Sequence, residues 1–144
     1  MIRIAESTDV KNIVDLIGSF VDDFLVDEKG REKFSSSVIQ ELVDDPKIHY
    51  LVYLENNQII GVISCRELSH IVHFFVDKQY HGKGIGKQLW NHIEYLVESN
   101  KTRVITVNSS SYAENIYKKM GFETISDVIE QDGLRFIKMQ KHML

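Results

Sequence analysis

The chain has 144 residues, 43% hydrophobic and 26% charged, which is ordinary for one globular domain with its own core. Lysine and arginine number 17 against 21 acidic residues, and 17 − 21 = −4, so the overall charge favours neither nucleic acid nor an anionic membrane. No apolar run reaches the roughly 18–20 residues of a spanning helix. The expectation is a single domain over residues 1–144 that binds neither nucleic acid nor membrane.

The beginning of the chain predicts a strand at 2–5 and then an amphipathic helix. Apolar residues at i, i+3 and i+4 spacing predict that this helix runs from Asp9 to about Phe24, with Thr8 or Asp9 as its cap. The first ten residues mix charge with apolar residues and lack the pattern of a secretory signal. The only cysteine, Cys65, excludes an internal disulfide, so the expected location is the cytoplasm.

A second helix and three strands follow. The acidic patch at 27–33 interrupts the helical pattern, and Ser37 with Gln40 forms a plausible capping box for the next helix, which Pro46 ends. The β-rich runs are 48–55, 58–68 and 70–77, and the first two are joined by an Asn56-Asn57 turn. This segment is predicted to be an antiparallel meander.

The second half predicts two more helices and three strands. A helix from about residue 85 to Asn100 precedes a strand at 103–108, and a short helix then ends at Gly121 in a left-handed cap. The last strands, 123–131 and 134–141, flank an Asp132-Gly133 turn. The order β-α-α-β-β-β-α-β-α-β-β predicts a mixed α/β fold, with a parallel strand–helix–strand unit around Gly82.

The stretch "QYHGKGIGKQL" from Gln79 to Leu89 predicts exposed backbone amides at a helix start, where the helix dipole favours an anion. Bare backbone at Gly82, Gly84 and Gly86 would let a phosphate reach these amides, and two lysines in the loop add positive charge. A merely tight turn between strand and helix is the alternative. A dinucleotide fingerprint fails because lysine stands at the third glycine position, and a Walker A motif fails because no serine or threonine follows Gly86-Lys87.

The stretch from Val76, V-D-K-Q-Y-H-G-K-G-I-G, closely resembles the acyl-CoA loop of the GNAT superfamily of N-acetyltransferases, whose pattern is Q/R-x-x-G-x-G/A. The second family motif, VN followed by A-x-x-x-Y-x-x-x-G-F, is matched by Val107-Asn108, Ala113, Tyr117, Gly121 and Phe122. The resemblance covers nearly the whole chain. It implies a mostly antiparallel central sheet with helices on both faces and acetyl-CoA as cofactor.

The resemblance also implies transfer of an acetyl group to a primary amine, by direct attack in a ternary complex. The amine belongs to a small molecule or a protein, and homodimers are common in the family. The position six residues before Val76 carries a glutamate in many relatives and is His70 here. A module that binds CoA without catalysis therefore remains the alternative function.

The resemblance assigns a role to each candidate residue. The backbone N–H groups of Phe75 and Val76 would polarise the thioester carbonyl, and Tyr117 would be the general acid and also contact the cofactor. The other cofactor-binding residues would be Gln79, His81, Gly82, Lys83, Gly84, Ile85, Gly86, Lys87 and Asn108. The base would be His70, with Glu67 or a water chain as rivals.

Two further expectations concern the surroundings of the base and the acceptor. His73 lies three residues after His70, so strand alternation predicts opposite faces and argues against a metal site. The resemblance places acceptor specificity at 20–34 and 130–135. The acidic residues at 22, 23, 27 and 28 could attract a cationic amine there, or form a solvated acidic face.

Overall fold

The computed structural model describes residues 1–144, and its elements follow the predicted order with one short extra helix, α2. The strands are β1 (Ile2–Ile4), β2 (Ile48–Glu55), β3 (Gln58–Arg66), β4 (His70–Val76), β5 (Val104–Ser109), β6 (Glu123–Gln131) and β7 (Leu134–His142). The α-helices are α1 (Val10–Gly18), α2 (Glu28–Arg31), α3 (Ser36–Asp44), α4 (Ile85–Ser99) and α5 (Glu114–Lys119). No helix combines the length and apolar character needed to cross a bilayer.

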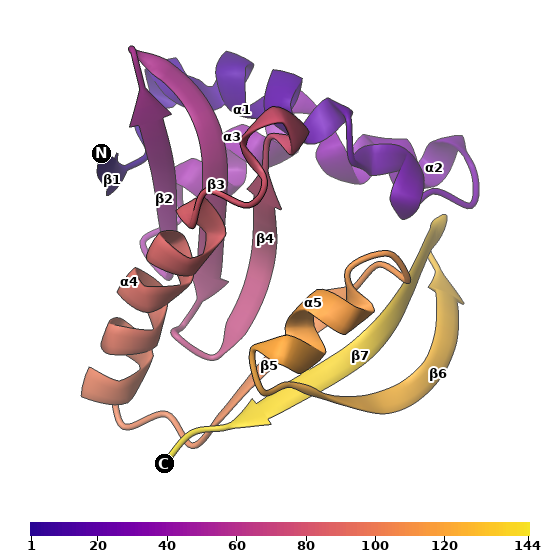
Figure 1. The fold of residues 1–144 in the computed structure, drawn as a ribbon. Helices are drawn as coiled ribbons and strands as arrows, with labels where there is room; N and C mark the ends of the chain where they lie inside the picture. Colours follow the sequence, from indigo (N-terminus) through magenta and orange to yellow (C-terminus); the bar gives the residue numbers. More distant parts are fainter.

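One seven-stranded sheet has the order β1-β2-β3-β4-β5-β7-β6, and Figure 1 shows it opening between β4 and β5. Every neighbouring pair is antiparallel except β4 and β5. These two parallel strands pair only through His70 with Thr106 and Ile71 with Val107, and then diverge. The predicted mixed, mostly antiparallel sheet is confirmed, and its one parallel junction opens the sheet in the middle.

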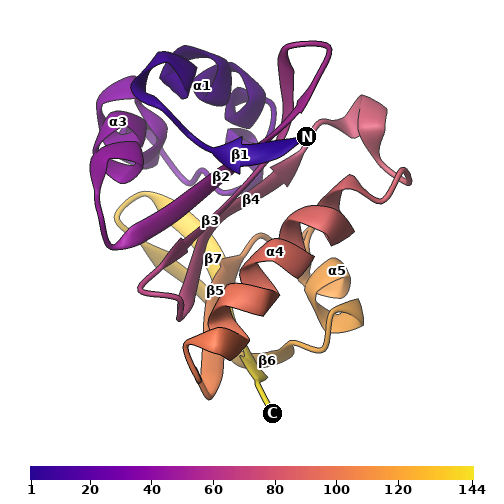
Figure 2. The ribbon, with the colours of Figure 1, turned by 90° about the vertical axis from the view of Figure 1, so that its left-hand side faces the viewer.

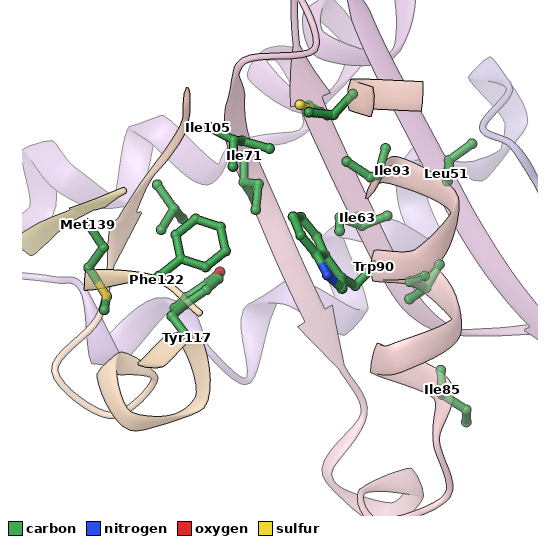
Figure 3. Packing of buried hydrophobic residues seen from close by; sticks show 14 of the residues in the cluster. Leu51, Ile63, Ile71, Ile85, Trp90, Ile93, Ile105, Tyr117, Phe122 and Met139 are labelled. Atoms are coloured by element: carbon green, nitrogen blue, oxygen red, sulfur yellow. The ribbon is translucent and has the colours of Figure 1, made fainter. Parts of the chain in front are cut away.

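Helices cover both faces of the sheet, and each face has its own apolar core. Figure 2 shows α1 and α3 on one face and α4 and α5 on the other. On the α4 side, the Phe122 ring meets the rings of Trp90 and Tyr117 edge-on, at centroid distances of 5.7 and 5.4 Å (Figure 3). On the α1 side, Ile13 and Ile39 are fully buried. Burying such side chains stabilises the fold by about 1.5–3 kcal/mol each, so both cores hold the open sheet in place.

The first helix is shorter than predicted. α1 ends at Gly18, and a 3-10 turn at Val21–Asp23 replaces its expected last turns. Phe20 stays buried although it lies outside the helix, which is why the apolar spacing continues past the helix end. At the other end, Asp9 stands at the predicted cap position of α1, but its side chain caps no N–H of that helix. Its carboxylate accepts the Glu6 backbone N–H at 2.7 Å instead, in the 3-10 turn that precedes α1.

The region between α1 and β2 also differs in detail from the prediction. The acidic patch contains α2, which Asp27 caps through its side chain. The cap of α3 is Ser35 rather than Ser37, because the Ser35 hydroxyl accepts the Val38 N–H at 3.4 Å. A run of three serines offers several possible caps, and the one at the extended backbone position is used. The helix ends before Pro46, as predicted.

The predicted tight turns are confirmed by their left-handed backbone. Asn56 and Asn57 have φ of 54° and 61°, and Asp132 and Gly133 have φ of 53° and 81°. These values match the turn type that joins two antiparallel strands without splaying them. Gly121, with φ of 98°, forms the left-handed stop after α5.

A bulge in β4 overturns the prediction that His70 and His73 face opposite sides of the sheet. Ser64 pairs with His73, but the next residue of β3 pairs with Ile71, so Val72 has no partner. The extra residue reverses the alternation of side chains along the strand. Both histidines consequently line the same cavity on the α1 side.

His73 should make the stability of the protein depend on pH. It is 5% exposed, and its Nδ1 lies 2.9 Å from the Tyr50 hydroxyl. Burial lowers the pKa of His73 from 6.5 to about 4. Because the unfolded chain takes up this proton and the folded chain does not, the free energy of unfolding should fall by up to roughly 3 kcal/mol between about pH 6.5 and pH 4. Urea denaturation at a series of pH values measures this fall.

The control separates His73 from the other histidines. His73→Gln should flatten much of the pH dependence, with a remainder from His70, whose pKa burial also lowers. His92→Gln, at an exposed position on α4, should keep the full dependence. An unchanged slope in the His73 variant would contradict the assignment.

Candidate active site

The loop between β4 and α4 presents backbone amides that no protein group accepts. Gly82 and Gly84 both have φ of +79°, a left-handed conformation that costs other residues roughly 1–2 kcal/mol. Gly84 is the N-cap of α4, and the first helical bond runs from Gln88 N–H to Gly84 O at 3.0 Å. The amides of residues 82–87 form no hydrogen bond within the protein. They lie at the positive end of the helix dipole, where an anion such as a phosphate can bind.

A cleft of about 370 Å³, here called the main cleft, begins at this loop and runs between the diverging strands β4 and β5 to α5. Most of the predicted binding residues line it. They are Phe75, Val76, His81, Gly82, Gly84, Ile85, Gly86, Lys87, Asn108 and Tyr117. The structure therefore brings both sequence motifs, which lie some 30 residues apart in the chain, to one continuous cavity.

Two predicted binding residues lie outside the walls of the main cleft. Gln79 is exposed in the turn that follows β4, and its backbone N–H bonds to the Asp77 carboxylate at 2.9 Å. The Lys83 ammonium lies 5.1 Å from the centre of the Tyr80 ring, on the solvent side of the loop. Cofactor binding by these two side chains stays a prediction, and Lys83 lies in the loop, where it adds positive charge.

Gly86 serves the cleft differently from Gly82 and Gly84. A Cβ at Gly86 would lie 3.6 Å from the side chains of Phe74 and Val76, in ordinary contact. A Cβ at either of the other two would meet no protein atom within 4 Å. The lack of a side chain at Gly86 therefore widens the cleft beside β4, while Gly82 and Gly84 leave open space in front of the amides.

The backbone N–H groups of β4 that face the opening are those of Phe74 and Val76. Asp77 N–H bonds to Ile60 O at 2.8 Å, which marks the side of the strand that β3 occupies. Because N–H groups alternate along a strand, Phe75 N–H also faces β3, and its two neighbours face β5. The structure corrects the prediction for Phe75 and adds Phe74, since the pairing register decides this and the sequence does not show it.

Tyr117 is buried, and its side chain lies on the main cleft from α5. Its ring packs edge-on against Phe74 at 6.2 Å. Burial raises the pKa of Tyr117. The phenol therefore stays protonated at neutral pH and is free to donate to a molecule in the cleft.

Sequence reasoning missed two apolar side chains at the same end of the main cleft. Tyr112 and Ile116 line it and are 60% and 48% exposed. A signal was present, because these large apolar residues lie on α5 and just before it, and a helix of six residues is too short to bury all of them beside Tyr117. Exposed apolar side chains beside a cavity often mark a ligand surface.

A second cavity, of about 270 Å³, lies on the α1 side of the sheet and is here called the aromatic pocket. Its walls include Phe34, His70, His73 and Phe136. It shares four lining residues with the main cleft, namely Phe24, Val72, Phe75 and Asn108. The two cavities therefore meet at the opening between β4 and β5.

His70 lines the aromatic pocket at the point where β4 and β5 still pair. Its Nδ1 is 2.7 Å from the Thr106 hydroxyl, and burial, helped by the charge of Arg66, lowers its pKa. It is therefore neutral at pH 7, so a ring nitrogen can accept a proton. The rival base Glu67 lies in the β3–β4 turn, where its Oε1 is 3.9 Å from Lys47 Nζ. It lines neither cavity.

The comparison with protein families decides the classification. A model described as acetyltransferase (GNAT) domain matches residues 21–143. The chain belongs to the GNAT acetyltransferase family. It is thus an acetyltransferase by family, as the two sequence motifs predicted.

Solved GNAT structures share this fold over almost their whole length. A GCN5-related N-acetyltransferase from Rhodopseudomonas palustris has a TM-score of 0.80 at 18% identity, covering 99% of this chain and 95% of that chain. The PaiA N-acetyltransferase from Thermoplasma acidophilum, solved in complex with coenzyme A, has a TM-score of 0.76 at 19% identity, covering 99% of this chain and 98% of that chain. An aminoglycoside 6'-N-acetyltransferase complexed with coenzyme A has a TM-score of 0.75 at 13% identity, covering 99% of this chain and 96% of that chain. At these identities the likeness establishes the GNAT fold.

In this GNAT chain Cys65 is placed where it cannot act as a nucleophile. It is fully buried in the core beneath α4, and burial raises the pKa of its thiol to about 11. It lines neither the main cleft nor the aromatic pocket. No group of three or more histidine, cysteine, aspartate or glutamate side chains is placed to hold a metal ion.

The last hairpin holds the segment between α1 and α3 over the aromatic pocket. Val26 N–H bonds to Gly133 O at 2.8 Å, and Arg135 N–H bonds to Phe24 O at 2.7 Å. Gly30 and Gly133 approach so closely that a Cβ at Gly30 would lie 2.1 Å from Gly133 O. The two regions that the sequence linked to acceptor specificity are thus packed together at the mouth of this pocket.

Proposed function

We propose that this protein is an N-acetyltransferase that transfers an acetyl group from acetyl-CoA to a primary amine by direct attack in a ternary complex. One observation carries the proposal. The main cleft runs without a break from the free amides of residues 82–87, past the exposed N–H groups of β4, to Tyr117. It meets the aromatic pocket that contains His70 at its inner end.

The loop fits the pyrophosphate of CoA. The amides of residues 82–87 offer several donors to phosphate oxygens, and the open space at Gly82 and Gly84 lets those oxygens approach. Lys83 and Lys87 add positive charge. The pantetheine arm would follow the main cleft between β4 and β5, where Asn108 offers an amide that can both donate and accept.

Acetyl-CoA supplies a thioester whose carbonyl carbon an uncharged amine can attack. The N–H groups of Phe74 and Val76 would stabilise the negative charge that develops on the carbonyl oxygen. The Val76 carbonyl is already occupied, since His81 Nε2 lies 2.7 Å from it. That contact ties the end of β4 to the loop.

The base and the acid lie on opposite sides of the opening. His70, in the aromatic pocket, would accept the proton of the amine directly or through water, because its lowered pKa keeps it neutral at pH 7. Tyr117, in the main cleft, would donate its phenolic proton to the departing sulfur, because its raised pKa keeps it protonated. Each group thus holds the protonation state that its step needs.

The pH profile tests the role of His70. Protonation of His70 removes the base, so kcat/KM should fall on the acid side with a midpoint below 6.5, the ordinary pKa of histidine. Thiol release from acetyl-CoA at a series of pH values, with the amine at a concentration well below its KM, measures this acid limb, the fall of kcat/KM toward low pH.

The matched variant is His70→Gln, which keeps a polar group of similar reach. It should lower kcat/KM by about 10²–10⁴-fold and abolish the limb. His142→Gln, at an exposed position near the C-terminus, is the control and should keep both rate and limb. A limb with the same midpoint in His70→Gln would show that another group is the base.

A panel of primary amines tests the proposed function as a whole. The protein is incubated with acetyl-CoA and each amine, thiol release is followed, and acetylated product is identified by mass spectrometry. Release of thiol in step with acetylated amine supports the proposal. CoA binding without turnover of any amine would favour a non-catalytic CoA-binding module, and absence of CoA binding would exclude both functions.

A further inference from the structure

We propose that the acceptor is a small amino acid-like molecule, in which an apolar body carries both the reacting amine and a nearby carboxylate, held in the aromatic pocket. This inference rests on the proposed function and specifies its second substrate. The position of the pocket supports it, because the pocket meets the main cleft at the sheet opening and contains the candidate base.

The size and walls of the pocket select a small apolar body. Its volume of about 270 Å³ is just below the roughly 300–1,000 Å³ of sites for drug-sized ligands. The hydrophobic walls come from separate parts of the chain and include Phe34 before α3, Leu42 on α3, Ile71 on β4, and Leu134 and Phe136 on β7. A long, flexible polyamine would leave these walls poorly covered.

The charged side chains of the pocket are all basic. Lys33 and Arg66 line it, and no aspartate or glutamate does. Lys33 forms no ion pair, and Arg66 has only a distant partner, Asp45 at 3.9 Å. Both cations are therefore available to an anionic group of a bound molecule.

A buried imidazole adds a polar group to the same pocket. His73 is 95% buried, since only 5% of it is exposed, and its Nδ1 lies 2.9 Å from the Tyr50 hydroxyl. This contact engages one ring nitrogen and leaves Nε2 to form a hydrogen bond with a polar atom of a ligand in the pocket.

The anion site and the base lie next to each other. Arg66 and His70 are directly opposite in the β3–β4 ladder, which places their Cβ atoms about 4.5–5.5 Å apart on one face. Both side chains line the aromatic pocket, so a molecule whose carboxylate meets Arg66 can present a nearby amine to His70. An α-amino acid carries these two groups close together.

The acidic residues that suggested a cationic amine are engaged elsewhere. Asp27 caps α2, and Asp22 and Glu28 both pair with Arg31, at 3.5 and 3.1 Å. Asp23 lines the main cleft and not the aromatic pocket. The attraction for a cationic amine that the sequence suggested therefore has no counterpart in this pocket.

The test compares L-phenylalanine with phenethylamine, which lacks only the carboxylate. Calorimetry on the full chain saturated with CoA measures binding of each, and thiol release measures turnover. L-Phenylalanine should bind at least about tenfold more tightly and be acetylated with the higher kcat/KM. Arg66→Met and Lys33→Met should each reduce this advantage, whereas Lys11→Met, on the exposed face of α1, should keep it.

Three outcomes would overturn the inference: equal or tighter binding of phenethylamine, preference for the diamine putrescine, or binding of neither aromatic probe. Titration of CoA alone, carried out first, separates this result from a failure of the proposed function. CoA binding and acetylation of putrescine would refute the acceptor class and leave the acetyltransferase intact. No CoA binding would refute the function itself.

Discussion

Gly84→Val should abolish binding of CoA. Valine is strained at φ of +79°, and its side chain would project into the open space in front of the loop amides. Charge-assisted hydrogen bonds contribute about 1.5–3 kcal/mol each, so blocking two amides should weaken binding by about 100-fold or more. Calorimetric titration with CoA measures the loss.

Two further variants separate the blocked amides from a disturbed backbone. Asparagine tolerates the left-handed conformation, so Gly84→Asn should fold normally and still bind CoA poorly, because its side chain occupies the same space. Gly18→Ala, at the end of α1 where a Cβ meets nothing within 4 Å, should bind CoA as the parent protein does. Undiminished binding by Gly84→Asn would refute the phosphate role of the loop.

Tyr117→Phe should lower kcat by about 10²–10⁴-fold while changing CoA affinity little. The substitution removes only the hydroxyl, so the ring packing with Phe74 and Phe122 and the melting temperature should be retained. The rate falls because the departing thiolate must then take its proton from water. Steady-state thiol release together with CoA titration separates the two effects.

The control for this variant is Tyr95→Phe, which removes a hydroxyl that is exposed on α4 and lies outside both cavities. Its kcat should equal that of the parent protein. An unchanged kcat in Tyr117→Phe would remove the tyrosine from the reaction. A parallel loss of CoA affinity and kcat would instead assign it to cofactor binding alone.

Features determined by local chemistry could be predicted from the sequence. The left-handed turns at Asn56-Asn57 and Asp132-Gly133 follow from residues that tolerate positive φ, and the helix after Gly84 follows from its apolar spacing. The glycine loop and the Tyr117 helix belong to motifs whose residues are close in sequence. Their meeting in one cleft followed from the family resemblance.

Features determined by pairing between distant strands could not be predicted from the sequence. The bulge at Val72 has no sequence signal such as a glycine, yet it turns His73 into the aromatic pocket and fixes which amides of β4 face the opening. The resemblance alone implied Phe75 by its position, whereas the pairing with β3 selects Phe74. The sequence also predicts too long a first helix, because Phe20 continues the helical spacing of core residues although the helix has already ended at Gly18.

The central claim is that one cavity system binds acetyl-CoA on one side of the sheet opening and an amine on the other, and joins them. Isotope-labelled acetyl-CoA, mixed with the protein and the best amine of the panel, tests it most directly by mass spectrometry. We predict that the labelled acetyl group appears on the amine nitrogen, with none on Cys65 or any other residue, and that Tyr117→Phe slows its appearance. Labelled protein in place of labelled amine, or label that remains on CoA while CoA is bound, would contradict the claim.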